Sequence, residues 1–180
     1  MIEKTYNKAC LLYDNELYTE SFELFLDLAK QGNIDSIKVV AGMFAHGMGT
    51  EKNDKLAFFW YEKLAKIGDE ESQYYYGIYL LSENKKEKGI HWLLTSAENN
   101  YAEAQYCLGA YYFYGNHVEI NKDKAISLYK KAALNGHKQA LDDLIWATKD
   151  YKGIMQAIFT IVKIMIELFK NHQKKVSDDN

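Results

Sequence analysis

The sequence lacks proline entirely, although average usage of about 5% would give roughly nine in a chain of this length. Proline breaks helix interiors and suits turns, so its absence favours helices joined by short connections. Arginine is also absent, because all 22 basic residues are lysine. Without the planar guanidinium fork that grips phosphates and guanine edges, and with a net charge of −3, the chain is a poor candidate for specific nucleic-acid binding.

Cysteine is scarce as well. Cys10 and Cys107 are far apart in the sequence and fit no metal-binding spacing, which favours two reduced thiols over a disulfide. The apolar run from Ala9 to Tyr13 is too short for a secretory signal and lies between the acidic residues Glu3 and Asp14. These features predict a cytoplasmic protein, and abundant Lys, Asn, Ile and Tyr without Arg or Pro suggests an AT-rich, bacterial genome.

The residue patterns of catalytic and metal sites are missing too. Gly42, Gly47 and Gly49 do not match a dinucleotide-binding or phosphate-binding loop, and no Lys-Ser/Thr pair follows them. The histidines are scattered without a second metal-binding residue at a useful spacing: His46, His91, His117, His137 and His172. The sequence therefore predicts no enzyme, no metal site and no cofactor.

What the sequence does contain is an internal repeat. Gly32, Gly68, Asn100 and Gly136 each follow an apolar helical run, at spacings of 36, 32 and 36 residues. Glycine and asparagine suit the left-handed conformation that ends a helix. Small residues recur at fixed distances from these four positions: three before (Ala29, Ala65, Ala97, Ala133), eleven before (Ser21, Ala57, Gly89, Ala125) and four after (Ser36, Ser72, Ala104, Ala140).

This periodicity predicts one helical hairpin per repeat. Small residues at fixed positions let neighbouring helices approach closely, while large apolar pairs such as Trp60-Tyr61 and Leu128-Tyr129 fill the space between layers. Asn53 and Asn121 stand where they would cap the second helix of a hairpin. A single hairpin cannot bury its apolar face, so the hairpins must stack.

Several segments resemble the Sel-one-like repeat, a relative of the tetratricopeptide repeat. One copy runs from Ala104 to Gly115 and continues through Asn121–Ala125 to Gly136, and a second includes Phe44–Gly49 and Phe59–Tyr61. The third, Ser72–Asn100, departs from the pattern, since its internal connection is four residues shorter and Gly89 replaces alanine. The resemblance covers about three quarters of the chain.

The resemblance implies an all-α, right-handed superhelix, or solenoid, of helical hairpins with a C-terminal capping helix. The first helix of each hairpin would line the concave side. The expected organisation is a solenoid over residues 1–152, an apolar helix over 153–172 and a disordered tail over 173–180. Within the solenoid we expect a degenerate half-repeat at 1–32, repeats at 33–68, 69–100 and 101–136, and a half-repeat at 137–150.

Candidate binding residues lie on the first helix of each hairpin. Counted from the small residue, positions +3, +7 and +10 fall off the packing arc and towards the expected concave face. Tyrosine is enriched at protein interfaces, so these positions predict a partner-binding surface. A tight superhelix would instead bury the same side chains between repeats, and the sequence leaves both interpretations open. The predicted partner-binding residues are Met43, His46, Tyr75, Tyr79, Tyr111 and Tyr114.

The segment Ile154–Phe169 is apolar over most of its circumference, with one narrow polar stripe. It is too short for a membrane span, which needs about 20 residues. The helix could cap the last repeat, form a homodimer, dock a partner or lie on a membrane surface, and capping is the preferred interpretation.

The predicted function is protein–protein interaction. Family members serve as adaptors and scaffolds, and in bacteria also as immunity proteins that neutralise secreted toxins. The sequence therefore favours a cytoplasmic immunity or inhibitor protein that binds a specific toxin or effector. The alternative is a scaffold or regulatory adaptor that dimerises through Ile154–Phe169.

Overall fold

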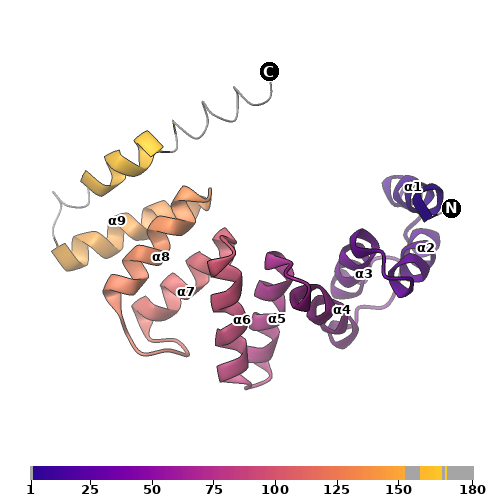
Figure 1. Cartoon of the computed structure of the whole chain (residues 1–180), viewed down its shortest axis with the longest axis horizontal. Helices are drawn as coiled ribbons and strands as arrows, with labels where there is room; N and C mark the ends of the chain where they lie inside the picture. The colour runs from indigo at the N-terminus through magenta and orange to yellow at the C-terminus, as the bar shows by residue number, and fades with distance from the viewer. Residues whose placement is uncertain (1, 153–158, 168, 170–180) are drawn as a thin grey trace. The chain divides into compact units, whose positions relative to one another are not determined.

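A computed structural model describes residues 2–152, 159–167 and 169 of the chain. Within these residues the chain is helical with no strand, and residues 159–167 form a further helical segment after the nine helices shown in Figure 1. Those nine are α1 (Ile2–Asp14), α2 (Tyr18–Lys30), α3 (Ile34–His46), α4 (Asp54–Lys66), α5 (Glu70–Ser82), α6 (Lys86–Glu98), α7 (Ala102–Tyr114), α8 (Lys122–Leu134) and α9 (Lys138–Lys152).

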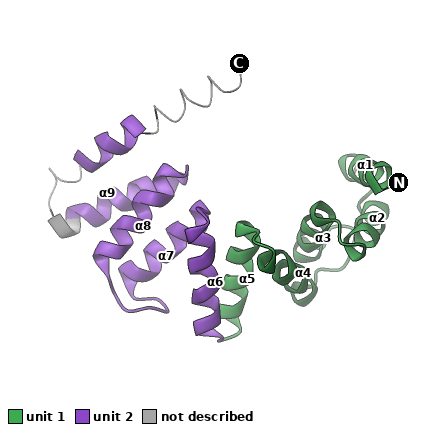
Figure 2. Ribbon diagram, in the orientation of Figure 1, with its two compact units in different colours: residues 1–84 green, residues 85–180 purple. Residues whose placement is uncertain are grey.

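The chain divides into two compact units, residues 1–84 and 85–180 (Figure 2). In the first unit each of α1 to α4 packs against the helix that follows it, and in the second unit the same holds for α6 to α8. This succession of antiparallel neighbours is the helical-hairpin repeat that the sequence predicts. The predicted domain boundaries themselves stay predictions.

Local capping explains where the helices begin and end. The side chains of Asn53 and Asn121 accept hydrogen bonds from the backbone amides of Leu56 and Lys124, at 3.0 and 2.9 Å, as predicted. The four residues that define the repeat all adopt left-handed backbone, with φ of 88°, 100°, 67° and 92° at Gly32, Gly68, Asn100 and Gly136.

The small residues of the repeat lie in the core. Ser36, Ala57, Ala104, Ala125 and Ala140 are all fully buried. A feature the sequence analysis missed adds to this packing: Gln73 and Gln105 are buried and donate side-chain hydrogen bonds to the carbonyls of Ala65 and Ala97, at 3.2 and 2.9 Å. Each glutamine ties the start of a first helix to the end of the preceding second helix.

The first 32 residues contain two helices, α1 and α2, which pack against each other. Their assignment as a degenerate half-repeat stays a prediction. Ala9 of α1 is fully buried, and its carbonyl accepts a 2.9 Å hydrogen bond from the Ser21 hydroxyl on α2. The two helices are therefore in close contact at Ala9 and Ser21.

The C-terminal apolar helix packs on the second unit through Ile164. This side chain is fully buried in one cluster with Phe113, Tyr129, Leu144 and Ala147, as the capping interpretation requires. Of the predicted helix and tail, residues 153–158, 168 and 170–180 lie outside the described residues.

Candidate functional site

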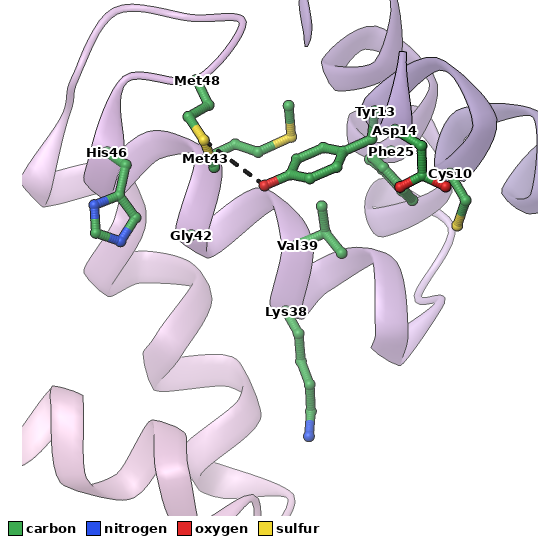
Figure 3. Close-up of a pocket in the computed structure, with 10 residues that line it drawn as sticks. All are labelled: Cys10, Tyr13, Asp14, Phe25, Lys38, Val39, Gly42, Met43, His46 and Met48. Atoms are coloured by element: carbon green, nitrogen blue, oxygen red, sulfur yellow. Dashed lines mark hydrogen bonds between the residues drawn. The ribbon is translucent and has the colours of Figure 1, made fainter. Parts of the chain in front are cut away.

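A cavity of about 440 Å³ lies in the first unit, between α1 and α3, with α2 behind it (Figure 3). Its size is within the range of about 300–1,000 Å³ that is usual for ligand pockets. Ten residues line it: Cys10, Tyr13, Asp14, Phe25, Lys38, Val39, Gly42, Met43, His46 and Met48.

The wall of the cavity is apolar and held in place by neighbouring rings. Phe25 and Met43 are 2% and 1% exposed, and Tyr6 contacts the Phe25 ring edge-on at 5.6 Å. The Tyr13 ring points from α1 towards Met43 and Met48, and its hydroxyl donates a weak hydrogen bond to the Met48 sulfur at 3.7 Å (Figure 3). These contacts give the cavity a fixed apolar lining.

The charges at the rim are unequal. Lys38 points away from the other lining residues (Figure 3). Its ammonium pairs with the carboxylate of Asp69, which caps α5. A hydrogen bond to that carboxylate raises the pKa of Lys38 above its usual value. Asp14 is exposed, and no described residue forms an ion pair with it. The rim is therefore anionic at Asp14 and neutralised at Lys38.

Two of the six predicted partner-binding residues, Met43 and His46, line this cavity. His46 is exposed at its edge, whereas Met43 belongs to the buried core beneath it. Val39, at the remaining off-arc position of α3, is also part of the lining. Helix periodicity therefore correctly grouped three residues of α3 that line the same cavity.

The predicted tyrosines lie elsewhere. In the first unit, Tyr79 stacks on Phe58 at 4.0 Å between ring centroids, and Tyr75, 38% exposed, stacks on Tyr61 at 5.1 Å. In the second unit Tyr111 is half-buried and Tyr114 is 59% exposed. None of the four is fully buried, and their role in partner binding stays a prediction.

Sequence reasoning missed the contribution of α1. Cys10, Tyr13 and Asp14 were not candidates, because the repeat was traced only from the helix ends that follow α2. A signal was present: Ala9 is the buried small residue of α1 as Ala41 is of α3, and matching these two places Asp14 at the position of His46.

The metal-binding and cysteine chemistry of the described residues is limited. Among the described residues, no group of three His, Cys, Asp or Glu side chains could hold a metal ion. Cys10 and Cys107 are both free thiols, as predicted, and burial raises the pKa of Cys107. In the part of the chain that the structure describes, no helix has the length and apolar character needed to cross a membrane.

The sequence model of the Sel1 repeat matches residues 40–69, 71–101 and 102–137, more than half of the chain. The chain belongs to the Sel1 repeat family. Sel1 repeats are protein–protein interaction modules and typically are not catalytic. This chain is accordingly built as an interaction module.

Similar proteins agree on the fold. A Sel1 repeat protein from Oxalobacter formigenes superposes with a TM-score of 0.73, at 22% identity, over 93% of this chain and 68% of that one. The Escherichia coli protective antigen c5321 gives 0.76 at 21% identity, over 95% of this chain and 38% of that one. The immunity protein Pa5087 from Pseudomonas aeruginosa gives 0.47 at 17% identity, which is too low to support an assignment.

One curated relative matches in sequence. The chitin synthase regulator SKT5 of Saccharomyces cerevisiae is 28% identical over 131 residues, which are 69% of this chain and 19% of the yeast protein. The chain thus spans about a fifth of that relative.

Proposed function

We propose that this Sel1 repeat chain binds a specific protein partner through the face formed by α1 and α3, and that it acts as a cytoplasmic immunity or inhibitor protein against a toxin or effector. The observation that carries the proposal is the apolar cavity between these two helices. It has a ligand-sized volume, a fixed lining and polar groups only at its rim, which is the usual composition of a recognition pocket.

The lining residues suit a protein partner. Aromatic residues and methionine are enriched at protein interfaces, and methionine adapts its shape to the group it contacts. Met43, Met48, Tyr13 and Phe25 supply this surface. A partner side chain entering the cavity would bury apolar area on both molecules.

Inhibition is the effect we expect from such binding. Among the described residues no group of three His, Cys, Asp or Glu side chains could hold a metal ion, and Sel1 repeats typically are not catalytic, so we expect an effect on a partner to come from occupying its surface. A chain that acts only by occupancy fits an inhibitor that covers the working face of a toxin or effector.

The proposal can be tested by site-specific photo-crosslinking in extracts of the native cell. A benzophenone amino acid is placed at His46, at the cavity edge, and in a control chain at Glu23, an exposed residue of α2 outside the lining. We expect one dominant crosslinked protein from the His46 position and little from Glu23. Equal labelling from both positions, or none from either, would reject binding at this face.

A scaffold or adaptor is the second candidate, favoured by the apolar surface of residues 159–167 and 169. Five large side chains there are 49–73% exposed: Phe159, Val162, Met165, Ile166 and Phe169. A dimer formed through this surface would show twice the chain mass in light scattering, and Met165→Asp would return it to the mass of one chain. A single-chain mass for the unmodified protein argues for the inhibitor.

A further inference from the structure

Gly42 is a glycine that the fold itself does not need. It lies inside α3, where glycine weakens a helix relative to alanine. Apart from its chain neighbours and the adjacent backbone of α3, a Cβ atom at this position would meet no described atom within 4 Å. The repeat pattern does not require glycine at position 42 either. The repeat has glycine five residues after the small position, at Gly77 in α5 and Gly109 in α7, and in α3 that position is Ala41.

Gly109 shows the contrast. A Cβ on Gly109 would lie 2.7 Å from Cδ1 of Tyr129, so the packing of α7 on α8 requires glycine there. At Gly42 the open space is the cavity instead. Glycine in such a place lets another group approach the helix backbone closely.

The residues around Gly42 indicate which chemical group of a partner the cavity would bind. Val39, Met43 and Phe25 form an apolar surface beside it. Lys38, the lysine of the cavity lining, is already paired with Asp69, whereas no described residue forms an ion pair with Asp14. Asp14 is also the last residue of α1, where the helix dipole adds partial negative charge.

We propose that the cavity over Gly42 binds a segment of a partner protein that inserts one large apolar side chain and places a lysine or arginine beside Asp14. Apolar contact supplies affinity, and the charge fixes the direction in which the segment lies, because complementary charge at an interface sets register. The proposal rests on the proposed function, since it specifies the partner segment that the same site would take.

Peptide selection tests the proposal directly. A random library is displayed against the purified full-length chain, and the affinity of selected peptides is measured by fluorescence polarisation for the unmodified chain and three variants. Gly42→Leu places a branched apolar side chain in the cavity, Asp14→Asn removes the rim charge, and Glu23→Gln is a matched control on α2. Circular dichroism and urea unfolding check that each variant is folded.

We expect the selected peptides to share a large apolar residue with a neighbouring lysine or arginine. Gly42→Leu should weaken binding at least about ten-fold, which is the value of one buried apolar side chain. Asp14→Asn should weaken it about two- to five-fold, as for an exposed ion pair, and should not affect a peptide whose basic residue is replaced by glutamine. Glu23→Gln should have no effect.

Selection of no peptide, selected peptides without a basic residue, or unchanged affinity in the folded Gly42→Leu chain would overturn the inference. These failures differ from failure of the proposed function. If a partner still crosslinks at His46 in the Gly42→Leu chain, the function stands and the assignment of the cavity is wrong. If peptides bind as described but no protein crosslinks at His46, the function fails.

Discussion

At the residue scale, Gly42 and Gly109 have opposite physical roles, and replacing each with alanine should change the free energy of unfolding in opposite directions. Gly42→Ala should raise the free energy of unfolding by about 0.5–1 kcal/mol, because alanine favours the helix and its methyl group enters open space. Gly109→Ala should lower it by about 1–3 kcal/mol, because the new methyl group meets the ring of Tyr129, which is 2% exposed and confined. Urea unfolding of the two variants gives the signs. A stabilising Gly109→Ala would contradict the packing described for α7 and α8.

The Asp69 carboxylate links helix capping to pH. It accepts a 2.9 Å hydrogen bond from the Ser72 amide and pairs with Lys38. Burial alone would raise the pKa of Asp69, but hydrogen bonds from Lys38 and Ser72 outweigh burial and hold the pKa below its ordinary value. Because the folded pKa is the lower one, the stabilisation is complete above the unfolded pKa of about 3.9 and is lost as the pH falls through the folded pKa.

Asp69→Asn should therefore destabilise the chain at neutral pH, and the difference from the unmodified protein should shrink as the pH is lowered through about 4 and below. Unfolding free energies measured across this range check it. Asp27→Asn is the control, since the carboxylate of Asp27 and its partner Lys30 are 70% and 61% exposed and should contribute little at any pH. If the difference in unfolding free energy between Asp69→Asn and the unmodified protein did not change with pH, the charge of Asp69 would not contribute to stability.

At the scale of elements, the helical segment 159–167 is expected to stabilise the second unit through one side chain. Ile164→Ala should lower the free energy of unfolding by about 2–5 kcal/mol, because the residue is fully buried against Phe113 and Leu144. Val162→Ala is the matched change at a position 49% exposed and should stay within about 0.5 kcal/mol. Chemical unfolding compares them, and equal effects would mean that the segment does not cap this unit.

The sequence predicts elements better than it predicts the site, and the reason is the range of the interactions. Caps such as Asn53 and Asn121 act within three residues, and the small positions recur with the repeat, so both are visible in one chain. The same periodicity placed Met43 and His46 on one side of α3. Contacts between helices are harder to predict from the sequence. The hydrogen bond from Gln105 to the Ala97 carbonyl, for example, depends on how α7 packs against α6.

At the scale of the whole molecule, the cavity is formed by α1, α2 and α3, and the repeat pattern in the sequence does not predict that these three helices share a site. The cavity needs Tyr13 and Asp14 from α1, where repeat similarity is weakest, together with Phe25 from α2 and the face of α3. Its depth also needs Gly42 at a position where the other repeats do not have glycine. A repeat predicts what its copies share, whereas specificity for a partner comes from the residues by which one copy differs.

Methionine methyl groups offer a direct test of binding at this cavity. In the full chain labelled with ¹³C-methyl methionine, Met43 and Met48 report on the cavity, and Met165, 60% exposed in the other unit, is an internal control. On titration with the captured partner, the Met43 and Met48 resonances should shift together and saturate while Met165 stays fixed. Saturable shifts confined to Met165, with Met43 and Met48 unmoved, would contradict partner binding between α1 and α3.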